Sequence, residues 1–219
     1  MDFEKARFNM VEQQIRPWDV LDAHVLDTLM EIKREDFVPP AYRALAFADV
    51  ELPLGPGPGQ NMLSPKIEGR MLQAVQVRKA DRVLEIGTGT GFTAALLAAH
   101  AEQVVSIEID PALAAQARAN LARAHIHNVS VIEGDGARGW PANAPYDVIV
   151  LSGSTPVLAD ALPAQLKVGG RLFAIVGEGA AMQAQLITRV GEGQFQTVAL
   201  FETSVTALVN APQAEHFAF

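Results

Sequence analysis

The stretch VLEIGTGTGF, residues 83–92, decides the fold of this chain. Its first residues, V-L-E-I, have the composition of a buried strand. They run directly into a turn built on Gly87, Gly89 and Gly91, and an alanine-rich apolar segment with a helical pattern follows. Glycine permits a tight turn and lets the backbone approach a ligand closely. The stretch therefore predicts the first strand, turn and helix of a nucleotide-binding sheet.

Downstream of this stretch, short apolar runs alternate with helical patterns, which is typical of a mostly parallel sheet. We expect a doubly wound α/β fold of the Rossmann-like kind. The expected strands cover residues 83–86, 103–107, 129–133, 148–151 and 171–176, with later strands near 185–190 and 195–202, and the expected helices cover residues 93–101, 111–124 and 157–165.

Upstream, apolar residues at helical spacing predict two helices, over residues 3–14 and 19–32, that form an N-terminal helical cap. The stretch LPLGPGPGQ, residues 52–60, is too rich in proline and glycine for a helix or a central strand, so we expect a loop. A helix over residues 65–75 follows, with Ser64 as its N-cap. We expect a single domain over residues 1–219, divided into a cap and loop (1–58), an α/β core (59–205) and a C-terminal tail (206–219).

Acidic residues follow the next two expected strands. Glu108 lies 21 positions after Gly87, close to the separation of about 20 at which a carboxylate holds a ribose diol. Asp135, in the run EGDG, ends the strand after that. Each carboxylate alone also fits a solvated loop or a helix cap. The carboxyl ends of parallel strands meet at one edge of a sheet, however, so together they predict one nucleoside-binding site.

The glycine spacing separates two cofactor classes. A dinucleotide fold uses G-x-G-x-x-G, whereas this chain has G-x-G-x-G with Phe92 at the sixth position. Glu85, two residues before Gly87, would repel a pyrophosphate but tolerate a cationic methionine group. Both observations favour S-adenosylmethionine over NAD.

The composition excludes several other functions. Lys and Arg number 17 against 25 Asp and Glu, a net charge of −8, which argues against a nucleic-acid partner. The chain has no cysteine, and its five histidines lack metal-ligand spacing, so we expect no metal. The N-terminus has charges throughout, and no apolar run is long enough to cross a membrane. We therefore expect no membrane partner and a cytoplasmic enzyme.

Beyond the glycine stretch, the segments KREDFVPP (33–40), LPLGPGPGQ, VVSIEID (104–110) and GDGARGWPANAPYDVIV (134–150) resemble the protein-L-isoaspartate O-methyltransferase family. The resemblance implies methyl transfer from S-adenosylmethionine to the side-chain carboxylate of an isoaspartyl residue in a peptide or protein, as a step of protein repair. It also implies a class I methyltransferase fold and a set of cofactor-binding residues, for which the candidates are Glu85, Gly87, Thr88, Gly89, Glu108, Ile109, Asp135, Gly136 and Ser152. Ser152 equally fits an ordinary turn serine.

The chain departs from the family at one position of the acceptor site. The family has I-S-Q-P-Y after the glycine-rich loop, and here the text reads M-L-S-P-K, so Leu63 stands at the family serine and Ser64 one residue later. Either a local adjustment lets Ser64 serve as the catalytic hydroxyl, or the hydroxyl is lost and the acceptor differs. A third reading makes Ser64 only a helix cap. Lys66 and Arg70 on the following helix either attract an anionic acceptor or form a solvated face.

Three functional hypotheses follow. The first is an isoaspartyl carboxyl methyltransferase, the second a relative acting on a small acidic acceptor, and the third a cofactor-binding protein without transfer activity. The C-terminal tail ends with Phe217 and Phe219, and such apolar ends usually dock. It docks on the chain's own surface, over the active site as a lid, or on a second subunit, which would make the protein a homodimer.

Overall fold

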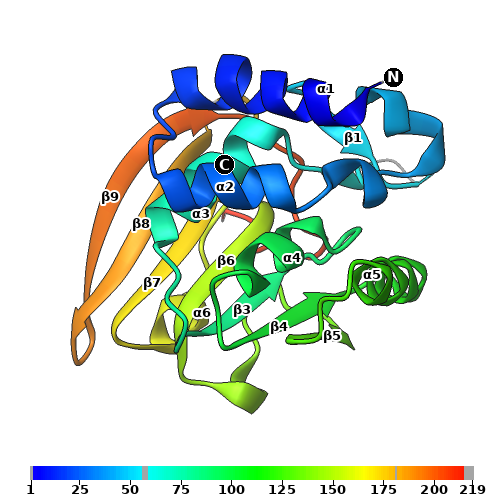
Figure 1. The fold of residues 1–219 in the computed structure, drawn as a ribbon. Helices are drawn as coiled ribbons and strands as arrows, with labels where there is room; N and C mark the ends of the chain where they lie inside the picture. The colour runs from blue at the N-terminus through cyan, green and yellow to red at the C-terminus, as the bar shows by residue number, and fades with distance from the viewer. Residues whose placement is uncertain (1, 56–58, 181, 215–219) are drawn as a thin grey trace.

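The computed structural model describes residues 2–55, 59–180 and 182–214. Within these residues seven strands form one twisted sheet, in the order β5-β4-β3-β6-β7-β8-β9 (Figure 1). The strands from β5 to β7 are parallel, and β8 and β9 add an antiparallel pair at one side. The strands of this sheet are β3 (Arg82–Ile86), β4 (Gln103–Glu108), β5 (Val129–Glu133), β6 (Tyr146–Thr155), β7 (Leu166–Val176), β8 (Met182–Gly191) and β9 (Gln194–Thr203). The expected α/β fold is confirmed.

Alternate residues of the central strands face two separate apolar cores, as expected for a strand buried on both faces. Val83 and Val148 belong to the larger core, whereas Leu84 and Ile149 belong to the smaller one. Side chains of three helices contribute to the larger core: α3 (Pro65–Val75), α4 (Phe92–Ala98) and α5 (Pro111–Arg123). The order of the strands and these helices brings the ends of β3, β4, β5 and β6 to one edge of the sheet.

The N-terminal cap packs on the same side of the sheet as α3 and α4 (Figure 1). Helix α1 (Phe3–Met10) continues through a π-helical turn (Val11–Ile15) and a 3-10 turn (Arg16–Trp18), and α2 (Ala23–Glu31) follows. Two buried ion pairs hold the cap, Arg7 with Glu35 and Arg34 with Glu68. Cap residues such as Met10 and Leu29 join the larger core, so cap and sheet share one apolar interior.

Two expected segments differ from the structure. The helix expected over residues 157–165 is reduced to α6 (Ala161–Ala164), because Pro163 is tolerated in the first turn of a helix but not in the interior of one that starts at residue 157. The loop expected over residues 52–60 contains a short antiparallel pair, β1 (Leu52–Pro53) with β2 (Asn61–Met62), at its two ends. Residues 56–58 of that loop lie outside the described residues.

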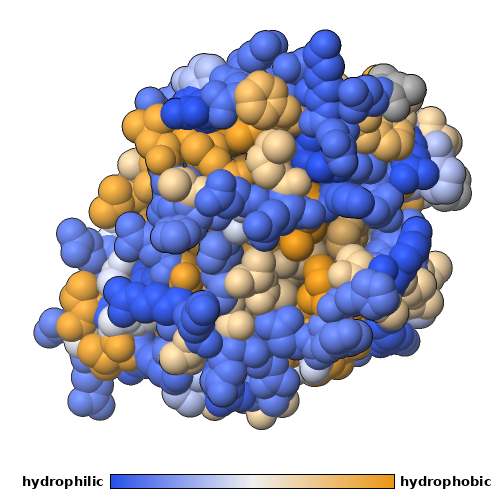
Figure 2. All heavy atoms as spheres, in the orientation of Figure 1, coloured by the Kyte–Doolittle hydropathy of each residue, from blue (hydrophilic) through white to orange (hydrophobic). Residues whose placement is uncertain are grey.

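The structure gives the order of the last two strands and the path of the tail, neither of which the sequence predicts. β8 pairs with β7, and β9 forms the edge of the sheet. Figure 2 shows a mainly hydrophilic face with apolar groups along the side where β9 lies, and Phe195 and Val198 are exposed apolar residues of that strand. After β9 the chain turns back toward β6, where Ala207 forms a parallel bridge with Ser154. Phe217 and Phe219 lie outside the described residues. No helix of the described part is long and apolar enough to span a bilayer.

Candidate active site

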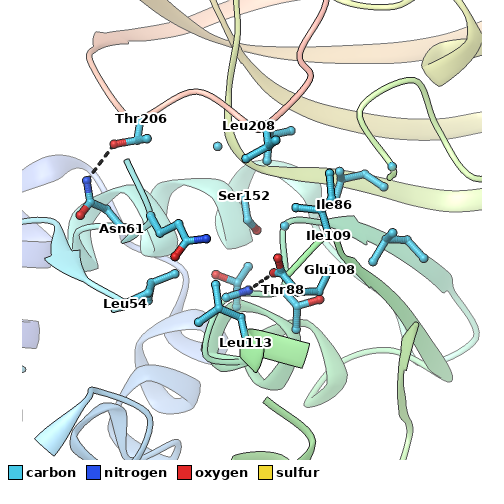
Figure 3. Close-up of a pocket in the computed structure, with 18 of the residues that line it drawn as sticks. Leu54, Asn61, Ile86, Thr88, Glu108, Ile109, Leu113, Ser152, Thr206 and Leu208 are labelled. Atoms are coloured by element: carbon cyan, nitrogen blue, oxygen red, sulfur yellow. Dashed lines mark hydrogen bonds between the residues drawn. The ribbon is translucent and has the colours of Figure 1, made fainter. Parts of the chain in front are cut away.

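One pocket lies at the carboxyl ends of the parallel strands, where the sequence predicts the cofactor site (Figure 3). The pocket is lined by residues of β3, β4 and β6, of the loops after β3, β4 and β5, of the starts of α4 and α5, of the segment before α3 and of the tail. Of the predicted site residues, the pocket lining includes Gly87, Thr88, Gly89, Glu108, Ile109, Asp135, Gly136 and Ser152. Glu85 and Ser64 are not in that lining.

The glycine turn has a backbone that L side chains rarely adopt. Gly87, Gly89 and Gly91 have φ angles of 91°, 54° and 86°, which explains why the sequence needs glycine at these three positions. A Cβ at Gly87 would also lie 2.9 Å from the Leu208 side chain. The turn is anchored to the next strand, because the Gly87 N–H donates to the Ile107 carbonyl at 2.9 Å. The backbone therefore lies open to the pocket and is held rigidly.

Glu108 ends β4 and is buried at the pocket wall. Its Oε2 accepts a hydrogen bond from the Gly89 N–H at 2.7 Å, and its Oε1 accepts from the Asp110 N–H at 3.0 Å. Each carboxylate oxygen can accept a further bond. The carboxylate is thus pre-positioned between the glycine turn and the loop to α5, where a ribose diol would meet it. Asp110 caps α5, as expected, with Oδ1 accepting from the Ala112 N–H at 2.8 Å.

Glu85 lies behind the pocket wall and is hydrogen-bonded to two serines that connect it with the lining. Its carboxylate accepts from Ser106 Oγ at 2.6 Å and from Ser152 Oγ at 2.8 Å, and Ser106 Oγ lies 2.5 Å from Thr88 Oγ1. Burial raises the pKa of Glu85 to about 8, although the hydrogen bonds from the two serines oppose the shift. Glu85 therefore orients Ser152 directly, and Thr88 through Ser106; both Ser152 and Thr88 line the pocket.

Asp135 and Gly136 line the pocket in the loop after β5, where the chain lies close to Ile86 and Ile107. Asp135 Oδ1 accepts from the Ala137 N–H at 3.0 Å, and Oδ2 accepts from Asn210 Nδ2 at 2.9 Å. A Cβ on Gly136 would lie 2.7 Å from Ile86 Cδ1, so only glycine fits there. This part of the pocket combines apolar side chains with a carboxylate and backbone groups, as an adenine ring requires.

The tail closes the pocket from above. Thr206, Ala207, Leu208 and Val209 line it, and the Leu208 N–H donates to the Ser154 carbonyl at 2.8 Å. Residues 206–209 thus dock at this site, whereas the end of the tail that carries Phe217 and Phe219 lies outside the described residues. Sequence reasoning did not find these residues, because a long-range return of the chain leaves no local pattern.

Sequence reasoning also missed Ser106. A lone serine in the apolar strand VVSIEI could have indicated a buried hydrogen-bonding role.

The comparisons with known proteins agree with this geometry. Residues 5–212 match the model of the family described as Protein-L-isoaspartate(D-aspartate) O-methyltransferase (PCMT). The chain belongs to this family.

Its relatives cover most of the chain. A protein-L-isoaspartate O-methyltransferase of Rhodopseudomonas palustris is 44% identical over 86% of this chain and 75% of its own length, and one of Methanoculleus marisnigri is 43% identical over 90% and 88%. A solved protein-L-isoaspartate O-methyltransferase matches with a TM-score of 0.79 at 27% identity, over 94% of this chain and 65% of that one. A Plasmodium falciparum beta-aspartate methyltransferase, solved with S-adenosyl-L-homocysteine, has the same fold, with a TM-score of 0.77 at 16% identity over 95% and 98% of the two chains.

As a protein-L-isoaspartate O-methyltransferase family member, the chain is an S-adenosylmethionine-dependent methyltransferase. The pocket fits that cofactor on two observations of this structure. Its lining holds carboxylates but, among the described residues, no Lys, Arg or His that would favour a pyrophosphate. Gly87, Gly89 and Gly136 line the pocket without side chains, so a ligand can approach their backbone closely.

Leu63, which the resemblance aligns with the family serine, lines the pocket. Ser64 follows it at the N-cap of α3, with its backbone extended. Its hydroxyl does not form the expected capping bond and, among the described residues, is buried without a hydrogen-bond partner. The structure therefore does not support either role expected for the Ser64 hydroxyl, and its catalytic assignment stays a sequence-based prediction.

The cations of α3 are paired away from the pocket. Lys66 forms an ion pair with Asp49 at 2.9 Å and lies over the Trp18 ring. Arg70 donates to the Trp18 carbonyl at 2.8 Å and lies over the Phe201 ring. Neither lines the pocket, so both attach α3 to its neighbours rather than attracting an anionic acceptor.

Proposed function

We propose that this chain transfers the methyl group of S-adenosylmethionine to the side-chain carboxylate of isoaspartyl residues in peptides or proteins. One observation carries the proposal. The pocket that contains the glycine turn, Glu108 and Asp135 extends without interruption to the segment 59–63 and to the tail, so that cofactor and acceptor ends form one cavity.

In this proposal the cofactor-binding roles follow the geometry of the lining. Gly87, Thr88, Gly89 and Ser152 hold the methionine part, and Glu108 accepts from the ribose hydroxyls. Ile109, Asp135 and Gly136 hold the adenine. Glu85 positions Ser152 and takes no direct part. When bound, S-adenosylmethionine supplies an electrophilic methyl group on a sulfonium sulfur.

The residues around the acceptor carry little acid–base chemistry, and the reaction needs little. A carboxylate is ionised at neutral pH, so no general base has to activate it. Leu63, Leu208 and Leu54 line the cavity and exclude water, and the walls fix the direction of approach. Alignment and exclusion of water are therefore what this chain contributes to the rate.

The ester product explains the link to repair. The backbone N–H of the following residue attacks the activated ester carbonyl, methanol leaves, and a succinimide forms that reopens partly to aspartate. The alternative function proposed from the sequence is methyl transfer to a small acidic acceptor. We also propose, from the sequence, that the protein is a homodimer and is located in the cytoplasm.

The test compares two peptides that differ only in the linkage of one aspartate. The protein is incubated with S-adenosylmethionine labelled in the methyl group and with either the isoaspartyl peptide or its normal aspartyl isomer. We expect label in the isoaspartyl peptide alone, released as methanol by mild base. Equal labelling of both peptides, or labelling of neither, would overturn the proposal. Labelling of a small-molecule fraction in place of either peptide would favour the small acidic acceptor.

A further inference from the structure

Asn61 and Thr206 lie beside each other at one end of the pocket (Figure 3), and Glu51 is hydrogen-bonded to both. Asn61 Nδ2 donates to Thr206 Oγ1 at 2.8 Å and to Glu51 Oε2 at 3.2 Å, and Thr206 Oγ1 donates to the same carboxylate oxygen at 3.3 Å. Asn61 and Thr206 line the pocket, whereas Glu51 stands behind them. In Figure 3 the pair lies across the cavity from Ile86 and Ile109, which mark the adenine end.

An anionic acceptor entering this end meets neutral donors only. Among the described residues that line the pocket there is no cation, and Leu63 provides no hydroxyl where the family has one. A carboxylate taken out of water needs hydrogen bonds from its surroundings. The Asn61 amide and the Thr206 hydroxyl are side-chain donors in the right place.

Both donors are already directed at a carboxylate, that of Glu51. Its Oε2 accepts from both, while its Oε1 is buried without a hydrogen-bond partner among the described residues. Burial raises the pKa of Glu51, against the hydrogen bonds from Thr206 and Asn61. Burial disfavours the charged form of Glu51, and a neutral carboxyl group gives up its two donors at a lower cost than a buried carboxylate would.

We propose that Asn61 and Thr206 hold the acceptor carboxylate during methyl transfer, and that this carboxylate takes the place of Glu51 as their partner. The proposal rests on the isoaspartyl activity proposed above and names the residues that determine its acceptor specificity. Glu51 is a positioning residue in the free protein and a competitor for the donors when the acceptor binds.

The test uses Thr206→Val, which keeps the shape of the side chain and removes the hydroxyl, and Thr206→Ser, which returns it. Thr197→Val, on exposed β9, is the matched control. We expect Thr206→Val to raise the KM for an isoaspartyl peptide about tenfold or more, as for a lost hydrogen bond to a charged group. Its kcat and its affinity for S-adenosylhomocysteine should change little. Thr206→Ser should restore the parent KM, and Thr197→Val should leave it unchanged.

Glu51→Gln distinguishes the proposal from a purely structural role of the Asn61–Thr206–Glu51 cluster. Removing the competing charge should lower the KM for the peptide, because the donors are released more easily. A Thr206→Val KM equal to the parent value, or a Glu51→Gln KM that rises as in Thr206→Val, would overturn the inference while leaving the isoaspartyl activity in place. A parent enzyme that labels no isoaspartyl peptide would overturn both, and that result is visible before any variant is made.

Discussion

Replacing Glu108 by alanine should weaken cofactor binding without unfolding the protein. In the structure its two oxygens accept from the Gly89 and Asp110 N–H groups at 2.7 and 3.0 Å and face the pocket. A hydrogen bond to a charged group is worth about 1.5–3 kcal/mol, so losing the ribose contact should reduce the affinity for S-adenosylhomocysteine by about 10- to 150-fold. Loss of the two internal bonds should cost about 1–2 kcal/mol, a fall in Tm of roughly 2–8 °C.

The neighbouring strand supplies the control. Glu133 pairs in register with Glu108, but it is exposed, bonds to Arg118 and is absent from the pocket lining. Glu133→Ala should therefore bind S-adenosylhomocysteine as the parent does. Calorimetric titration measures both affinities, and thermal melts measure both stabilities. A Glu108→Ala protein that binds as tightly as Glu133→Ala would show that Glu108 serves only to fasten the glycine turn.

Three further predictions concern the buried groups around the pocket. Folding raises the pKa of Glu85 from 4.5 to about 8, so between these pH values the folded state holds a proton that the unfolded state releases. The free energy of unfolding should therefore fall as the pH rises from 4.5 to about 8, and Glu85→Gln should flatten the dependence of Tm on pH over that range. Gly136→Ala places a Cβ 2.7 Å from Ile86 and should destabilise by about 1–3 kcal/mol in thermal melts, whereas Gly55→Ala, with its nearest neighbour at 4.0 Å, should be tolerated. Ser64→Ala removes a buried hydroxyl without a described partner, so Tm should hold or rise and the single-turnover rate should not change; a slower rate at parent affinity for S-adenosylhomocysteine would restore Ser64 to the reaction.

The sequence predicts the cofactor end of the site, because short continuous stretches of the chain determine its geometry. The turn after β3 needs glycine because its φ angles are positive, and Glu108 and Asp135 stand at strand ends that parallel topology must bring together. The same reasoning placed Glu85 in direct contact with the cofactor, whereas burial and two serine partners keep it behind the wall. Strand parity explains the difference, since Glu85 pairs in register with Ser106 on the neighbouring strand and their side chains point to one face.

Contacts between distant segments could not be read in this way. Thr206 reaches Asn61 and Glu51 across about 150 residues of sequence because the chain returns to β6 after β9. The sequence of the tail has no periodic pattern from which this return could be predicted. The acceptor end of the pocket is built from three such segments, whereas the glycine turn comes from one continuous stretch, and this is why the cofactor end was the more predictable of the two.

The backbone around Leu63 bears on the two readings of the missing hydroxyl. For Ser64 to serve in place of the family serine, the peptide between residues 63 and 64 would have to turn toward the pocket. Two contacts oppose that movement: the buried Arg34 donates to the Leu63 carbonyl at 2.6 Å, and the Ser64 carbonyl accepts from the Ile67 and Glu68 N–H groups in the first turn of α3. Arg34 is itself paired with the buried Glu68, so moving the segment would break a compensated charge pair as well as a helix turn. These contacts favour the reading in which the hydroxyl is lost at this position over the one in which it is displaced by one residue, and on that reading the donors that hold an acceptor carboxylate come from another wall of the same cavity.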